Sequence, residues 1–129
     1  MMVVHKHLII RAEVKQPPKA EEKSLMEHWF IKLIEDIDMK LLSGPHIKYV
    51  DVPGNKGMTG VCIIETSHIA MHVWDEPDPA LIQLDVYTCG PINIGMVFDA
   101  LHLFDPVKIE YKFLDREKNL TTVLEGNIR

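Results

Sequence analysis

Residues 60–88 read GVCIIETSHIAMHVWDEPDPALIQLDVYT, and this stretch decides the fold class. It contains three apolar runs, at 60–65, 68–74 and 81–88, which are rich in β-branched side chains and therefore predict three β-strands. The links between the runs are short and hairpin-like, which favours antiparallel neighbours over parallel strands. The run at 60–65 is apolar almost throughout and indicates a central strand.

The flanking sequence predicts two helices and more strands. After Ala20, the residues Leu25, Trp29 and Leu33 recur every four positions, which is the spacing along one face of a long helix. The Gly44-Pro45 pair is expected to end this helix. A second helix is predicted at 92–104, and further strands are predicted at 7–14, 47–52 and 107–113.

Strands clustered between two helices predict an α+β fold, a two-layer sandwich in which a mainly antiparallel sheet packs against two helices. The polar tail from Asp115 adds no predicted element. The length of 129 residues fits a single domain spanning 1–129, since a division would leave two marginal cores.

The composition excludes several classes of function. The net charge is −5 and no run of basic residues stands out, so a nucleic-acid partner is not expected. No stretch approaches the roughly 18 apolar residues of a membrane span, and residues 1–6 lack the layout of a signal peptide, so we expect a cytoplasmic protein. The two cysteines are too few for a disulfide framework or a cysteine zinc site, and Cys62 reads as a buried apolar residue.

Ser67, His72 and Cys89 place a nucleophile, a base and a proton donor within 23 residues. The spacing of His68 and His72 suits a helical zinc pair, but in a strand the two lie about 13 Å apart, so no metal is predicted. A Gly-x-Ser-x-Gly elbow is absent around Ser67, which disfavours a serine hydrolase. Isolated polar residues of a half-buried sheet remain the alternative reading.

Two segments resemble a known family. Residues 67–76, SHIAMHVWDE, and residues 83–90, QLDVYTCG, resemble the signature of the short prokaryotic-type S-adenosylmethionine decarboxylases, roughly ESHxxxHTWPE followed by a strand ending in TCG. The GMTGV at 57–61 resembles the segment that precedes the cleavage strand of that family, and His7-Leu8 resembles its opening strand.

The resemblance implies a self-processing enzyme. Cleavage between Thr66 and Ser67 would give a β chain, 1–66, and an α chain, 67–129, which begins with a pyruvoyl group made from Ser67. That carbonyl can form an imine with the amine of S-adenosylmethionine and take up electrons during decarboxylation, without pyridoxal phosphate or a metal. The product would be the aminopropyl donor for spermidine synthesis.

The resemblance also implies roles for single residues. His72 would be the base that assists processing, helped by the Thr59 hydroxyl at the ester stage. Cys89 would return a proton to the substrate after carbon dioxide leaves, and Glu76 would accept hydrogen bonds from the ribose hydroxyls. Tyr49 is the nearest candidate for the aromatic residue that stacks on the adenine.

Strand parity adds a constraint of its own. Ser67 and His72 have opposite parity on one extended segment and would lie about 16 Å apart, so they cannot meet within one strand. We therefore expect a symmetric homodimer in which each site combines residues of both chains, as in the short members of the family.

The chain departs from the family pattern at several positions. Thr66 stands where the family usually has glutamate, and Cys89 comes two residues later than expected. Two other functions stay open at this point. One is a pyruvoyl-dependent ornithine or arginine decarboxylase of the same fold, and the other is an unprocessed homologue that acts as a binding or regulatory partner.

Overall fold

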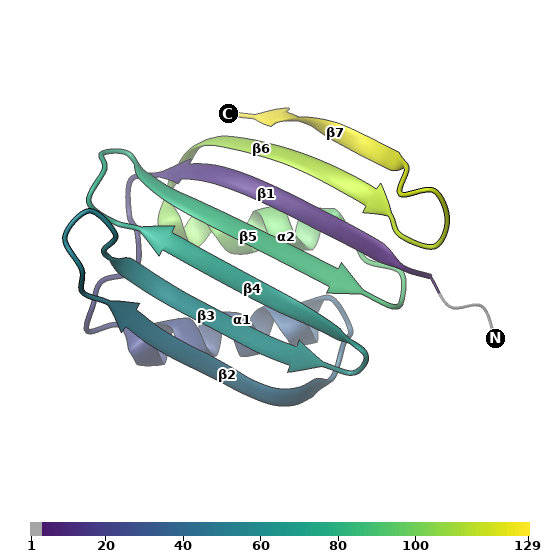
Figure 1. The fold of residues 1–129 in the computed structure, drawn as a ribbon, viewed down its shortest axis with the longest axis horizontal. Coiled ribbons are helices and arrows are strands. Elements are labelled where there is room, and N and C mark those ends of the chain that lie inside the picture. The colour runs from purple at the N-terminus through teal and green to yellow at the C-terminus, as the bar shows by residue number, and fades with distance from the viewer. Residues whose placement is uncertain (1–3) are drawn as a thin grey trace.

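A computed structural model describes residues 4–129, which form one seven-stranded sheet with two helices on one face (Figure 1). Residues 1–3, part of the N-terminal stretch considered for a signal peptide, lie outside the described residues. All strand pairs are antiparallel and follow the order β2-β3-β4-β5-β1-β6-β7. The predicted α+β sandwich is confirmed. The strands are β1 (Lys6–Val14), β2 (Leu41–Val50), β3 (Gly57–Ile64), β4 (Ser67–Trp74), β5 (Ala80–Thr88), β6 (Pro106–Asp115) and β7 (Thr122–Ile128).

The sheet has one covered face and one open face because side chains alternate along each strand. In β4, Ser67 and Met71 are buried toward the helices, while His68 and His72 lie on the other face. The same alternation runs through β1 and β5, whose buried residues form the centre of the core. Residues of these three strands therefore alternate between the core and the open face.

The helices cover the sheet with apolar side chains at helical spacing. Helix α1 (Lys23–Asp36) buries Trp29, Phe30 and Leu33, and Phe30 lies against Gly60 of β3, where a Cβ would approach its ring to 2.6 Å. Helix α2 (Ile94–Leu101) continues into the short 3-10 helix η1 (His102–Phe104). Together they span most of the helix predicted at 92–104. The indole nitrogen of Trp29 donates to the Ala100 carbonyl at 2.9 Å and joins the two helices.

The predicted end of the first helix is wrong. The helix ends at Asp36, and Gly44-Pro45 lies inside β2, where the pairing with β3 shifts register. The apolar repeat ends with Ile37, which is 4% exposed, whereas Leu41 is 40% exposed at the start of β2. Two irregularities in the β2–β3 register let a strand tolerate a glycine and a proline at this point.

Two further expectations about the strands are wrong. The run at 60–65 belongs to β3, which is next to the edge strand β2, and the centre of the sheet is β5. The tail after Asp115 forms β7, which pairs with β6 at the other edge. Most β7 side chains are exposed, so the strand carries no alternation of apolar and polar residues that a sequence pattern could detect.

Among the described residues, no helix has both the length and the apolar character needed to cross a membrane.

Candidate active site

The turn between β3 and β4 contains the predicted scissile bond. Ile64 pairs with Ser67, so Glu65 and Thr66 alone make the turn. Thr66 has a φ of 61°, in the left-handed region that β-branched residues rarely adopt. A positive φ at the third position of a four-residue turn normally calls for glycine, and a non-glycine residue held there costs about 1–3 kcal/mol. The Thr66–Ser67 peptide bond therefore directly follows a strained residue.

Ser67 carries a buried hydroxyl without a hydrogen bond of regular geometry. The residue is 7% exposed, and its Oγ is the one buried side-chain oxygen or nitrogen in residues 4–129 that has no hydrogen-bond partner. Leaving such a group unsatisfied costs about 1–3 kcal/mol. Both lone pairs are unoccupied, and the Thr66 carbonyl carbon is the adjoining main-chain atom, so the hydroxyl suits attack on that carbon.

Cys89 lies beside this turn because of the register of β4 and β5. His68 pairs with Tyr87, and two steps further the same register brings Cys89 opposite Thr66. The Thr66 Oγ1 lies 2.6 Å from the Cys89 Sγ, and that sulfur lies 3.5 Å from the Glu65 carbonyl oxygen. The structure thus brings Thr66, Ser67 and Cys89 together within one chain.

The two cysteines differ in their electrostatic surroundings. The hydrogen bond from the Thr66 hydroxyl lowers the pKa of the Cys89 thiol, and the nearby Ser67 hydroxyl, which forms no hydrogen bond of regular geometry, adds to this effect. Burial in the core raises the pKa of Cys62 to about 11. Cys62 is the buried apolar residue that the sequence predicts, and Cys89 is the thiol available for chemistry.

Thr59 and His72 form a second group on the open face. They are directly opposed in the β3–β4 ladder, and the Thr59 Oγ1 lies 2.8 Å from the His72 Nδ1. His72 is exposed and lies on the opposite face of β4 from Ser67, about 16 Å along the strand for five residues. The pair predicted to assist processing is therefore assembled, but away from the Ser67 of its own chain.

Glu76 and Tyr49 lie at the other end of the β3–β4 hairpin. The Lys56 amide donates to Glu76 Oε1 at 3.3 Å, and the Tyr49 hydroxyl donates to Asp75 Oδ2 at 2.8 Å. A hollow of about 490 Å³ lies here, lined by Gly54, Trp74, Glu76, Pro77 and Leu81. Since β4 separates this end from Ser67 by seven residues, or about 23 Å, one chain does not bring the predicted substrate-binding residues to the predicted nucleophile.

Ionisation of Tyr49 is expected to report this contact. The hydrogen bond to Asp75 raises the pKa of Tyr49 to about 12, above the value of about 10 for an unfolded tyrosine. The neutral phenol is thus favoured by folding, and its contribution to stability is present below pH 10 and is lost as pH rises toward 12. Tyrosinate absorbance that disappears in Tyr49→Phe should develop at about pH 12, and Asp75→Asn should move it down. A Tyr49 midpoint at about 10 in the unsubstituted protein would contradict the contact.

A network on the open face joins three central strands. His7 of β1 and His68 of β4 both place Nε2 against Oδ1 of Asp85 on β5, at 2.8 and 2.9 Å. Burial acts to raise the pKa of Asp85, but the two histidine hydrogen bonds outweigh it and the pKa is lowered. Sequence reasoning missed the grouping. His7, His68 and Asp85 all lie within the segments that resemble the family, but the register that joins them is not visible in the sequence.

The same three side chains are close enough together to be considered as metal ligands. Their ligand atoms lie within 4.8 Å of one another. However, Nη1 of Arg116 lies 3.2 Å from Nδ1 of His7, and a guanidinium only donates. His7 Nδ1 must therefore accept, so Nε2 keeps the hydrogen that it donates to Asp85 and has no lone pair for a metal. The arrangement favours a hydrogen-bonded network, and the absence of a metal cofactor stays a prediction.

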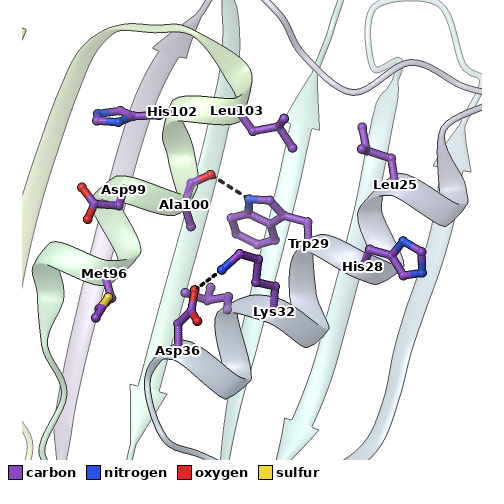
Figure 2. Close-up of a pocket in the computed structure, with 11 residues that line it drawn as sticks. Leu25, His28, Trp29, Lys32, Asp36, Met96, Asp99, Ala100, His102 and Leu103 are labelled. Atoms are coloured by element: carbon purple, nitrogen blue, oxygen red, sulfur yellow. Dashed lines mark hydrogen bonds and ion pairs between the residues drawn. The ribbon is translucent and has the colours of Figure 1, made fainter.

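A further hollow lies on the helical side of the molecule. It is a groove of about 850 Å³ between α1 and α2, and Figure 2 shows Trp29 at its floor with the bond to Ala100 and the Lys32–Asp36 ion pair beside it. None of the predicted site residues lines this groove. The candidate site therefore lies elsewhere, divided between the two ends and the open face of the sheet.

Comparison with known proteins identifies the family. The sequence model of the S-adenosylmethionine decarboxylase family matches residues 6–117. The chain belongs to this family. The match includes every residue of the candidate site, from the strand that carries His7 to the segment after β6.

Three curated S-adenosylmethionine decarboxylase proenzymes are similar in sequence. The protein of Archaeoglobus fulgidus is 36% identical over 62 residues, which cover 46% of this chain and 54% of the relative. That of Picrophilus torridus is 32% identical over 62 residues, 46% of each chain. That of Pyrococcus horikoshii is 28% identical over 90 residues, 70% of this chain and 60% of the relative. The chain thus spans about half the length of the curated relatives it matches.

A solved structure supports the fold. The adenosylmethionine decarboxylase of Aquifex aeolicus superposes with a TM-score of 0.68 over 94% of this chain and 99% of its own, at 21% identity. The S-adenosylmethionine decarboxylase fold predicted from the segments around Ser67 and Cys89 is therefore confirmed.

Proposed function

We propose that this protein is a self-processing enzyme that decarboxylates S-adenosylmethionine, using a pyruvoyl group made from Ser67, and so makes the aminopropyl donor for spermidine synthesis. The observation that carries the proposal is the group at the β3–β4 turn, within the region that matches the family. There a buried, unpaired Ser67 hydroxyl follows a strained Thr66 and lies beside a thiol of lowered pKa. A cytoplasmic location stays a prediction from the sequence.

Processing begins at Ser67. Its Oγ adds to the Thr66 carbonyl carbon, the peptide C–N bond breaks, and the nitrogen takes a proton, which leaves an ester. Elimination then removes the α-hydrogen of residue 67 and breaks its Cβ–Oγ bond, which releases residues 1–66 with a Thr66 carboxylate. Water hydrolyses the remaining unit to a ketone and ammonia. The strain at Thr66 and the unpaired hydroxyl raise the energy of the uncleaved chain relative to these products.

The residues present fit such a group. The pyruvoyl carbonyl would supply the electron sink that no protein side chain offers. Cys89, held at the same turn, would return a proton to the substrate carbon after carbon dioxide leaves. Glu76, which lines the hollow of about 490 Å³, would bind the nucleoside through its ribose hydroxyls, and Tyr49, whose hydroxyl donates to the neighbouring Asp75, would bind it through its ring.

The divided site requires a second copy of the chain. The nucleophile and the proton donor lie at one end of the sheet, the processing pair on the open face, and the nucleoside residues at the other end. A two-fold axis through the open face would place the Ser67 end of one sheet over the Glu76 end of the partner's sheet. The same axis would create two identical sites. The open face supports this homodimer with exposed apolar residues at Ile9 (42%), Val61 (36%) and Ile63 (45%).

Mixing two inactive chains tests the shared site. Ser67→Ala removes the nucleophile and His72→Ala removes the processing base, so each chain alone should stay uncleaved. In the mixture, a heterodimer holds an intact Ser67 on one chain and an intact His72 on the other, so a fraction of the His72→Ala chains should be cleaved. Mass spectrometry distinguishes the two chains. A mixture that stays wholly uncleaved, despite exchange of subunits, would count against the shared site.

The substrate is tested by release of labelled carbon dioxide. S-adenosylmethionine, ornithine and arginine, each labelled at the carboxyl carbon, should be compared with the same purified protein. We expect release from S-adenosylmethionine alone, because Glu76 and Tyr49 suit a nucleoside that the two amino acids lack. Release from ornithine or arginine instead would contradict the proposed substrate.

A further inference from the structure

Thr66 occupies a position that its side chain is poorly suited to fill. Its φ of 61° lies in the left-handed region, where glycine is free of strain and a β-branched residue is not. The ladder fixes this geometry, because Ile64 and Ser67 pair on either side and leave two residues for the turn. A threonine that is held in such a position has its hydroxyl in a fixed direction.

That direction is toward Cys89. The Thr66 Oγ1 lies 2.6 Å from the Cys89 Sγ and 2.7 Å from the Glu65 carbonyl oxygen. A hydroxyl has one hydrogen, so it donates either to the sulfur or to the carbonyl, and in the second case its lone pairs can accept the S–H. The sulfur is held over the turn in both arrangements.

No other side chain in the part of the chain that the structure describes makes a regular hydrogen bond to this sulfur. Its remaining partner is the Glu65 carbonyl at the longer distance of 3.5 Å, and the Ser67 Oγ forms no bond of regular geometry. The Thr66 hydroxyl is also the largest cause of the lowered pKa of Cys89. The Thr66 hydroxyl is therefore the main determinant of the position and the acidity of the thiol, and the Ser67 hydroxyl makes a smaller contribution to its acidity.

We propose that Thr66 is a positioning residue for Cys89, whose hydroxyl holds the thiol beside the Thr66–Ser67 peptide bond in the uncleaved chain. The proposal rests on the proposed function only for the role of Cys89 as a proton donor. The contact between Thr66 and Cys89 does not depend on that role. It gives a reason for a threonine, and for the backbone strain that comes with it, at a position of positive φ.

The test measures the thiol directly in a chain that cannot be cleaved. In a Ser67→Ala background, the rate of Cys89 alkylation by iodoacetamide is followed against pH for the Thr66 parent, Thr66→Val and Thr66→Ser. Cys62 is fully buried and does not interfere. Valine keeps the shape and the branching but lacks the hydroxyl, so its midpoint should move to higher pH, while serine should keep the parent value. Thr66→Ala serves as a second variant without a hydroxyl if valine unfolds the chain.

Cleavage provides a second readout in chains that retain Ser67. Thr66→Val should be cleaved about tenfold more slowly than Thr66→Ser, the effect of one net hydrogen bond on a rate. Equal alkylation midpoints for valine, serine and threonine would overturn the inference, even if the enzyme is active. A shifted midpoint in the Ser67→Ala background, together with no release of carbon dioxide by the chain that retains Ser67, would support the inference and reject the proposed function.

Discussion

Ser67→Ala is expected to leave one uncleaved species of 129 residues that releases no carbon dioxide from S-adenosylmethionine. The substitution removes the one oxygen that can attack the Thr66 carbonyl carbon, and it removes the precursor of the pyruvoyl group. Both cleavage and decarboxylation should therefore fall to background. The folded state should survive, because the lost hydroxyl makes no hydrogen bond of regular geometry and an alanine side chain fits in its place.

Intact mass and thermal unfolding measure the two parts of this result. Ser24→Ala is a matched control, since Ser24 is exposed on α1 and should leave cleavage and activity unchanged. Cleavage that continues at the same bond in Ser67→Ala would show that another group performs the attack.

Cys89→Ala is expected to reduce decarboxylation by about 10²–10⁴-fold, the usual contribution of a positioned proton donor. The rate should be expressed per cleaved chain, because loss of the thiol also removes the partner of the Thr66 hydroxyl and is expected to slow processing. Cys62→Ala is the matched control for loss of a thiol, since Cys62 is buried in the core, where it pairs with Ile69, and has no role in the proposed reaction, so kcat should stay nearly unchanged.

The pH dependence of decarboxylation gives this prediction a direction. A donor must hold its proton, so Cys89 loses this function once its thiol ionises at alkaline pH. Decarboxylation should fall on the alkaline side in the unsubstituted enzyme, and this limb should be missing from the residual activity of Cys89→Ala. A kcat within threefold of the parent, roughly the scatter of a single-residue effect, would remove Cys89 from the reaction.

Much of the candidate site could be predicted from residues 67–90. The strand periods there are regular, so parity alone separates Ser67 from His72, and the structure places the two on opposite faces. The pairing of Thr59 with His72 and of Thr66 with Cys89 could not be predicted, because a ladder register depends on turn lengths that the sequence does not specify.

The errors in the predicted fold have physical causes of the same kind. Gly44-Pro45 usually ends a helix, but β2 accommodates both residues through two register shifts. The last strand, β7, is stabilised by pairing with β6 and buries little, so it leaves no periodic signal. The contact between His7 and Asp85 could not be predicted, because the two residues are 78 positions apart and meet only through the β1–β5 ladder.

Intact mass spectrometry of the unsubstituted protein tests self-processing at Thr66–Ser67 most directly. Two fragments of 66 and 63 residues are expected. The smaller should lack a free amino terminus, because a ketone replaces the amine of residue 67, and its mass should match a pyruvoyl group in place of serine. A single species of 129 residues that persists on prolonged incubation would contradict self-processing and favour an uncleaved binding partner instead.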